Sequence, residues 1–236
     1  PAYFGSSAFI DLIHTLQLEI SGAEISFAAP LSYDTEIKEG DVYVYDMFNL
    51  YKYENMLYTM KLSGKEIHDA LEMSYNLWTN RMQSPDDHIL LFRKKRREGA
   101  TDRAAFKNFS FNFDSAAGII YTVDVTKPEG DKVTILSMAD GTPFDMNKMY
   151  KVALNSYRGN GGGELLTKGA GIPQDELKER IINSTDKDLR YYLMNYIDQK
   201  KLIEPRALGQ WKFIPEAWVV PASKRDYEYL FGKVQE

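Results

Sequence analysis

The stretch 155–164 reads Asn-Ser-Tyr-Arg-Gly-Asn-Gly-Gly-Gly-Glu and contains the residues best suited to binding chemistry. Apolar residues alternate through 150–154, which predicts a strand leading into a loop. Three successive glycines let the backbone approach a partner closely and expose its N–H groups, so we expect them to serve a ligand and not packing. Tyr157 and Arg158 stand just before the glycines, and an aromatic ring there suits a flat ligand. The alternative is an ordinary loop between a strand and a helix.

A second candidate ring is Tyr53, in the aromatic-rich loop 49–55 that precedes an expected strand at 56–62. If Tyr53 and Tyr157 face each other, they form a slot for a planar group. Stacking on an aromatic side chain contributes about 1–3 kcal/mol per base, enough to anchor a nucleoside without selecting the base. The alternative is that both tyrosines lie in the core with their hydroxyls hydrogen-bonded. The predicted substrate-binding residues are Tyr53, Asn55, Tyr157, Arg158, Gly161, Gly162 and Gly163.

Composition and motifs exclude several classes of function. The net charge of −5 argues against a nucleic-acid duplex as the main partner, because binding phosphates needs a basic face. The chain has no cysteine, which excludes thiolate catalysis and Cys-rich zinc sites. No run of 18 apolar residues occurs, so we expect no membrane span.

The histidines do not form a recognisable catalytic or metal-binding set. His14, His68 and His88 lie far apart in the sequence, and we expect His14 and His68 to be structural. Neither a Gly-x-Ser-x-Gly motif nor a phosphate-binding Gly-x-x-x-x-Gly-Lys-Ser/Thr motif occurs. We therefore predict no catalytic residue, no metal ligand and no cofactor within this chain.

The hydrophobic periodicity alternates between helical and strand-like segments. A helix is expected over 8–19, with Gly22 as its stop, and another begins at a capping box formed by Ser63 and Glu66. Three strands joined by short turns, at 119–125, from 133 onward and at 150–154, predict an antiparallel meander.

Later segments complete the predicted organisation. We expect a helix over 173–182, then a second capping box at 185–188 that opens another helix. Residues 81–108 are predicted to form a polar loop, and residues 205–236 an arm that wraps over the core. The predicted fold class is α+β, a mixed, largely antiparallel sheet packed with helices, with residues 1–236 as a single domain.

Several of these segments together resemble the C-terminal domain of the 5′-nucleotidase family. The resemblance is strongest to the branch of bacterial 2′,3′-cyclic-nucleotide 2′-phosphodiesterase/3′-nucleotidases, and it covers nearly the whole chain. The segments that carry it are Ala-Ala-Pro-Leu at 28–31, Asn-Leu-Tyr-Lys-Tyr-Glu-Asn-Met-Leu at 49–57, Tyr-Thr-Val-Asp-Val-Thr-Lys-Pro at 121–128, Asn-Ser-Tyr-Arg at 155–158 with Gly161-Gly162, and Gln-Trp-Lys-Phe-Ile-Pro at 210–215.

The resemblance implies a layered α/β fold and a division of labour between two domains. In this family an N-terminal metallophosphoesterase domain holds two divalent metal ions, and rotation between the domains delivers the phosphate to them. The C-terminal domain supplies an aromatic pair that stacks the base, which by position is Tyr53 and Tyr157. The implied partners are a nucleoside or nucleotide and that N-terminal domain, fused or separate. The implied location is the bacterial periplasm or another exported site.

Two departures from the family pattern affect the expected specificity. The 5′-nucleotidase branch has Asn-Gly-Gly-Gly-Ile-Arg where this chain has Ala-Pro-Leu-Ser-Tyr-Asp at 29–34, so its phosphate-side Asn and Arg are missing. It also has Asp at the position of Gly163, so its acceptor for the ribose hydroxyls is missing. The first departure is shared with the cyclic-phosphodiesterase branch, which favours that placement.

The function expected from the sequence is nucleotide recognition in nucleotide catabolism, on behalf of a metallophosphoesterase of the 5′-nucleotidase or 2′,3′-cyclic-nucleotide phosphodiesterase type. Without the metal-binding domain, the chain is expected to be inactive as a hydrolase. One alternative is a non-enzymatic binding or surface module that kept the fold and lost the ligand. Another is a self-sufficient hydrolase whose catalytic residues follow no recognised motif.

Overall fold

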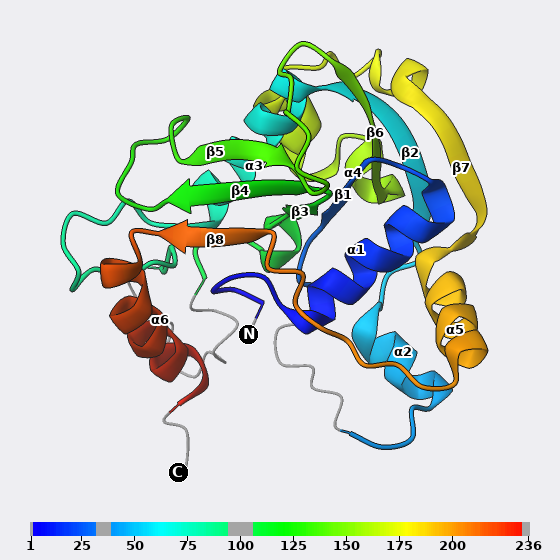
Figure 1. Cartoon of the computed structure of the whole chain (residues 1–236), viewed down its shortest axis with the longest axis horizontal. Helices are drawn as coiled ribbons and strands as arrows, with labels where there is room; N and C mark the ends of the chain where they lie inside the picture. Colours follow the sequence, from blue (N-terminus) through cyan, green and yellow to red (C-terminus); the bar gives the residue numbers. More distant parts are fainter. Residues whose placement is uncertain (1, 32–38, 94–105, 233–236) are drawn as a thin grey trace.

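The computed structural model of the chain describes residues 2–31, 39–93 and 106–232 (Figure 1). Its helices are α1 (Ala8–Ser21), α2 (Val44–Leu50), α3 (Gly64–Trp78), α4 (Ser156–Gly159), α5 (Leu189–Lys200) and α6 (Glu216–Phe231). Its strands are β1 (Ile25–Ala28), β2 (Met56–Ser63), β3 (Ser115–Ala117), β4 (Ile119–Asp124), β5 (Val133–Met138), β6 (Met149–Asn155), β7 (Ile181–Asp188) and β8 (Trp211–Ile214).

The strands form two sheets. Five of them pair in the order β3-β1-β6-β2-β7, and three pair in the order β5-β4-β8. Within the larger sheet β6 runs parallel to β1 and antiparallel to β2, so that sheet is mixed. The α+β class with a mixed, largely antiparallel sheet is therefore confirmed.

The expected meander of three strands is wrong at its third member. β4 and β5 pair antiparallel as predicted, but β6 leaves them and becomes the central strand of the other sheet. Burial explains the choice, because Val152, Ala153 and Leu154 are all fully buried and so need cover on both faces of their strand. A central strand of a sheet with helices on both sides provides that cover.

The segment 173–182, predicted to be a helix, forms only a short 3₁₀ turn and the start of a strand. Residues Leu177–Arg180 make a single 3₁₀ turn, and β7 follows and pairs along β2 as an edge strand. The next helix, α5, begins at Leu189 with Asp188 as its N-cap, whose carboxylate accepts the Tyr191 N–H at 2.8 Å. The predicted capping residue Thr185 lies inside β7 instead, because pairing with β2 overrides the local helix signal.

The C-terminal segment is more regular than the extended arm expected for 205–236. β8 runs parallel to β4 and buries Trp211 and Phe213, and α6 continues from it. The sequence signal was weak because β8 is only four residues long and shows only two buried positions. In the stretch 81–108, which was predicted to be a polar loop, an isolated β-bridge joins Phe92 to Phe106, and another joins Leu90 to Thr79 just before the stretch. Residues 94–105 lie outside the described part of the chain.

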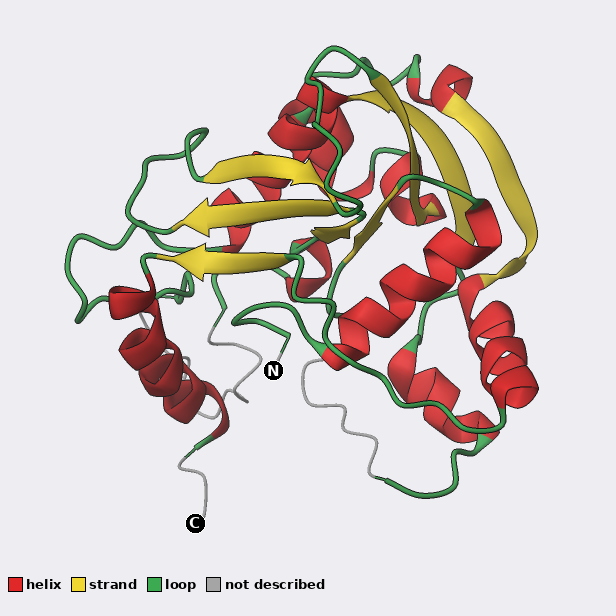
Figure 2. Ribbon diagram, in the orientation of Figure 1, coloured by secondary structure: helices red, strands yellow, loops and turns green. Residues whose placement is uncertain are grey.

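The elements stack in layers (Figure 2). One hydrophobic cluster joins α1, α2 and α5 to one face of the five-stranded sheet, through residues such as Ala28, Leu57 and Ala153. The opposite face contributes Phe27, Met60 and similar residues to a larger cluster that contains α3 and the three-stranded sheet. Among the described helices, none is long and apolar enough to cross a bilayer.

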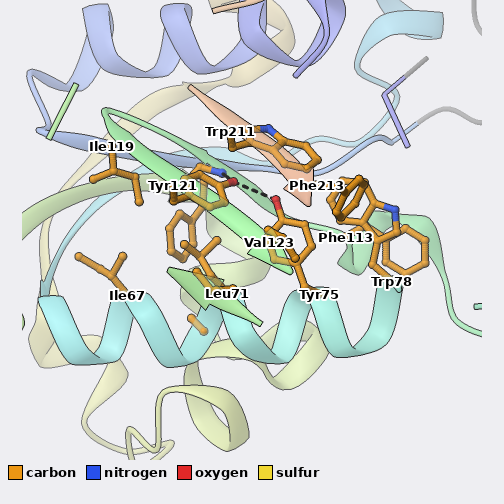
Figure 3. Packing of buried hydrophobic residues seen from close by; sticks show 14 of the residues in the cluster. Ile67, Leu71, Tyr75, Trp78, Phe113, Ile119, Tyr121, Val123, Trp211 and Phe213 are labelled. Carbon is orange, nitrogen blue, oxygen red and sulfur yellow. Dashed lines mark hydrogen bonds between the residues drawn. The ribbon is translucent and has the colours of Figure 1, made fainter. Parts of the chain in front are cut away.

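Helix α3 organises the larger cluster (Figure 3). Its start is the predicted capping box: the Ser63 hydroxyl accepts the Glu66 N–H, and the Glu66 carboxylate accepts the Ser63 N–H. Tyr75 and Trp78 stack with centroids 5.0 Å apart, and the Tyr75 hydroxyl is 2.9 Å from the Tyr121 hydroxyl of β4. The helix is thereby fixed to the smaller sheet by both packing and a buried hydrogen bond.

His14 attaches α1 to the larger sheet, in the structural role expected of it. The ring is fully buried, with Nδ1 2.9 Å from the Ser26 hydroxyl of β1 and Nε2 3.2 Å from the Ser115 hydroxyl of β3. Gln17 donates to the same Ser26 hydroxyl at 2.7 Å. Burial lowers the pKa of His14 to about 3, so the folded protein keeps the ring neutral.

This burial predicts an acid-sensitive fold. Because the folded pKa of His14 is about 3 and the unfolded pKa is about 6.5, the unfolded chain binds the extra proton first as the pH falls. The free energy of unfolding should fall by about 1.4 kcal/mol per pH unit below about pH 6 from this group alone. Urea unfolding from pH 7 to pH 4.5 measures it, and His14→Gln should flatten that slope. An unchanged slope in the variant would contradict the assignment.

Candidate functional site

Tyr53 and Tyr157, the two residues predicted to bind a ligand, lie at the same end of the five-stranded sheet. Because β2 and β6 run antiparallel, the residues just before β2 lie beside those just after β6. The Ser156 hydroxyl accepts the Met56 N–H at 3.1 Å and joins the two segments. The Tyr53 and Tyr157 side chains are 38% and 41% exposed, so neither fills the core as the alternative interpretation required.

Three groups hold the Tyr157 ring in place. A Cβ atom on Gly162 would come within 2.5–2.6 Å of three successive ring carbons, so the Gly162 backbone lies against one face of the ring. Phe111 meets the ring edge-on, with centroids 6.1 Å apart and planes at 84°. The Arg158 guanidinium lies 5.5 Å from the ring centroid. The ring is therefore oriented before any ligand arrives, which lowers the ordering cost of binding.

The three glycines pack against side chains, contrary to our expectation, and a contact between them and a ligand stays a prediction. A Cβ on Gly161 would meet the Gln174 side chain at 2.5 Å, and one on Gly163 would overlap the Arg158 and Asn112 side chains. Gly161 and Gly163 also adopt φ values of 92° and 68°, which residues with a Cβ rarely adopt. The loop can close on its own side chains only because these positions lack one.

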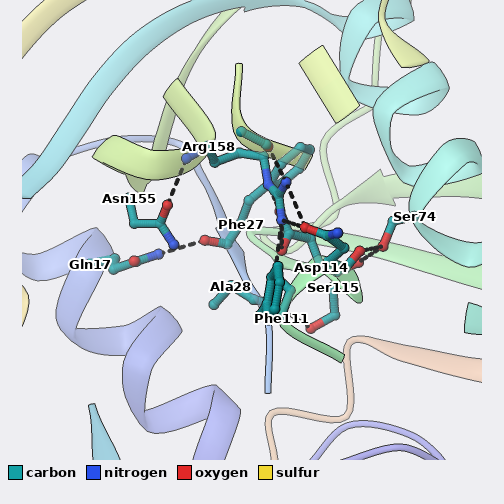
Figure 4. A network of polar contacts seen from close by, with 11 residues as sticks. Gln17, Phe27, Ala28, Ser74, Phe111, Asp114, Ser115, Asn155 and Arg158 are labelled. Carbon is teal, nitrogen blue, oxygen red and sulfur yellow. Dashed lines mark hydrogen bonds and ion pairs between the residues drawn. The ribbon is translucent and has the colours of Figure 1, made fainter. Parts of the chain in front are cut away.

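Arg158 is the residue around which that loop closes (Figure 4). The side chain is 1% exposed, and its Nε and Nη2 donate to the two carboxylate oxygens of buried Asp114 at 2.7 and 3.0 Å. Its remaining N–H groups reach the Gly162 and Phe111 carbonyls. These hydrogen bonds within the protein let Arg158 position the loop, and a contact between Arg158 and substrate stays a prediction.

The Tyr53 loop is anchored at both ends, with the tyrosine exposed between them. Tyr51 is buried, and burial raises the pKa of its hydroxyl, while the Asn55 and Asn155 side chains oppose that shift. The Asn55 carbonyl accepts the Leu189 N–H at 2.9 Å, which ties the loop to α5. The Asn55 side chain is partly exposed, and a direct contact between it and a ligand stays a prediction.

A cavity of about 940 Å³ lies elsewhere, against the outward face of α3. Glu72 and Lys132 line it, and neither tyrosine does. Lys132 donates to the Thr79 hydroxyl at 3.0 Å, and burial lowers its pKa to about 8. The Glu72 carboxylate of α3 accepts the Val133 N–H at 2.5 Å. Together with the contact between Lys132 and Thr79, this hydrogen bond attaches the start of β5 to α3. Within the described part of the chain, no group of three His, Cys, Asp or Glu side chains could hold a metal ion.

Sequence reasoning missed the residues that support Tyr157. Phe111 and Asp114 lie more than 40 positions before it, in a segment with no periodic pattern. The sequence does not show that Arg158 is buried, and therefore does not show that it needs a carboxylate partner. Nothing in the local sequence identified which of the acidic residues that would be.

Comparisons with known proteins identify the family of the chain. Residues 1–168 match the family described as 5′-nucleotidase, C-terminal domain. The chain belongs to this family. The match extends over all three segments that build the site, so the resemblance stated from the sequence is confirmed.

Individual relatives refine the placement within the 5′-nucleotidase C-terminal domains. The chain is 30% identical over 196 residues to the trifunctional nucleotide phosphoesterase protein YfkN of Bacillus subtilis, covering 78% of this chain and 12% of that protein. It is 25% identical over 197 residues to a 2′,3′-cyclic-nucleotide 2′-phosphodiesterase/3′-nucleotidase of Haemophilus influenzae, covering 77% of this chain and 27% of that protein. The chain therefore spans about a quarter or less of these relatives.

A solved structure shares the fold. The 5′-nucleotidase precursor from Thermus thermophilus superposes with a TM-score of 0.65 at 21% identity, over 92% of this chain and 37% of that one. This likeness extends the shared fold beyond residue 168, to most of the C-terminal segment.

The contact between Gly162 and Tyr157 gives a testable coupling. Gly162→Ala should destabilise the wild-type fold, because its new methyl group meets the Tyr157 ring, whereas the same change in a Tyr157→Ala background should cost little. We expect a coupling energy of about 0.5–3 kcal/mol in a double-mutant cycle measured by urea unfolding. Additive effects would show that the ring does not rest on Gly162.

Proposed function

We propose that this chain is the nucleotide-recognition domain of a metallophosphoesterase and binds the base between Tyr53 and Tyr157. The observation that carries the proposal is the pair of exposed tyrosines at one end of β2 and β6, one of them braced on a face and an edge by the protein. An exposed ring that the protein holds in one orientation can act as a stacking platform for a planar group. Stacking contributes about 1–3 kcal/mol for each base, and every base has a π-face.

The membership in the 5′-nucleotidase C-terminal family supports a nucleotide as the ligand. The relatives carry the names nucleotide phosphoesterase and cyclic-nucleotide phosphodiesterase/3′-nucleotidase. We propose that the two-metal chemistry resides in a metallophosphoesterase domain of which this chain is the partner, and that the protein is exported. The neighbouring reading frame tests this: a frame with no such domain, in a genome that encodes none elsewhere, would contradict it.

Two differences from the sequence pattern of the 5′-nucleotidase branch favour a substrate other than a simple 5′-nucleotide. The segment 29–34 lacks the Asn and Arg of the 5′-nucleotidase branch, and position 163 has no carboxylate. The Arg158 and Asn112 side chains occupy the space that a side chain at 163 would need. A 2′,3′-cyclic phosphate or 3′-phosphate has negative charge where a carboxylate would repel it, so we propose that such nucleotides are the substrates.

One observation favours the second candidate, a binding module that lost its ligand. Arg158 donates to the Gly162 carbonyl, and Gly163 packs against the Arg158 side chain. Fewer polar groups of the loop therefore remain to bind a sugar than the sequence suggested. That module would keep the fold without measurable affinity for nucleosides, and the experiment below separates the two.

Calorimetric titration of adenosine and uridine tests the stacking slot. Both nucleosides should bind, adenosine more tightly because its ring is larger. Tyr53→Ala and Tyr157→Ala should each weaken binding by about 1–3 kcal/mol, and Tyr→Phe at either site should change little, because the ring makes the contact.

A control is Leu136→Ala, which removes a side chain that is 59% exposed from β5 in the other sheet. Thermal melts report whether each variant folds. Wild-type affinity in folded Tyr157→Ala, or no binding by the wild type, would contradict the slot.

A further inference from the structure

Two phenylalanines extend the aromatic surface beyond Tyr157. Phe109 and Phe111 stack with centroids 5.1 Å apart and planes at 9°, and Phe111 in turn meets the edge of the Tyr157 ring at 6.1 Å. The Phe109 side chain is 65% exposed. The three rings form a continuous aromatic strip whose outer end, the Phe109 ring, lies open to solvent.

The strip is held rigid by the same ion pair that fixes the glycine loop. Phe109 immediately precedes the short 3₁₀ turn Ser110–Asn112, which contains Phe111, and the Asn112 N–H donates to the Phe109 carbonyl at 3.0 Å. Arg158 donates to the Phe111 carbonyl at 3.1 Å, next to its contacts with Asp114. Phe109 and Tyr157 are therefore set relative to each other by a buried network and not by a loose loop.

An exposed aromatic ring at a fixed distance from a base platform suits a second planar group of the same ligand. The two successive centroid distances place Phe109 no more than about 11 Å from Tyr157. Proteins that bind single strands place successive bases on successive aromatic side chains in this way, and each contact tolerates any base. A sugar–phosphate–sugar link is flexible enough to join bases on two such rings.

We propose that Phe109 is a second stacking subsite, which takes the second base of a ligand made of two nucleosides joined by a phosphodiester. This inference rests on the proposed function, because the first base is taken to occupy the Tyr53 and Tyr157 slot. It extends the proposed substrate class from mononucleotides to dinucleotides, which have an aromatic base on each side of the phosphate. Phe111 positions both rings, while Phe109 and Tyr157 contact the ligand.

Calorimetry with two ligands of equal charge tests the subsite. Adenylyl-(3′→5′)-adenosine carries the second base, and adenosine 3′-methyl phosphate carries the same phosphodiester without it. The wild type should bind the dinucleoside at least about fivefold more tightly than the methyl ester, which is about 1 kcal/mol of stacking. Phe109→Ala should abolish that difference and leave the methyl ester within about twofold. Phe109→Tyr should keep it, and Phe109→Leu should lose most of it.

The outcomes separate the two hypotheses. If the wild type binds neither ligand, the nucleotide-recognition function fails, and the subsite fails with it. If the methyl ester binds in a Tyr157-dependent way but the dinucleoside gains nothing, or if Phe109→Ala leaves the gain intact, the subsite alone is overturned and Phe109 is free to contact another protein domain. Thermal melts confirm that each Phe109 variant folds, as its exposure leads us to expect.

Discussion

The buried ion pair between Arg158 and Asp114 is the interaction on which the candidate site depends. It joins the turn after β6 to the segment before β3, two stretches 44 positions apart in the sequence. Removing both charges from water is expensive, and buried pairs often contribute little net stability compared with apolar replacements. Its value here is geometric: Arg158 uses its donors to fix the Gly162 and Phe111 carbonyls, and through them the Tyr157 ring.

The position of β6 in the larger sheet determines where Arg158 and Tyr157 lie. As the central strand it is covered on both faces, so its C-terminal end is rigidly placed when the chain enters the glycine loop. The start of β2, which carries the Tyr53 loop, is the antiparallel neighbour of that end. Helix α3 packs the larger sheet against the smaller one. The two candidate base-binding tyrosines therefore lie next to the end of β6 and the start of β2, which are both well packed.

The sequence predicted those features that depend on local pattern. The helix ending at Gly22 and the capping box of Ser63 and Glu66 follow from periodicity or short motifs, whereas exposure of the two tyrosines was one of two alternatives. The partner of β6 and the existence of β7 could not be predicted, because strand pairing is decided by distant residues. The packing role of the glycines could not be predicted for the same reason. Their φ values and their neighbours, such as Gln174, depend on the folded loop and not on the spacing of the glycines in the sequence.

The most direct test of base recognition is to observe which side chains touch the base. Nuclear Overhauser contacts between adenosine and isotope-labelled protein report this without any substitution. The account predicts contacts from the base protons to the ring protons of both Tyr53 and Tyr157 at saturating adenosine. Contacts confined to the residues of the cavity beside α3, such as Met73 and Leu77, or contacts to neither tyrosine, would contradict it.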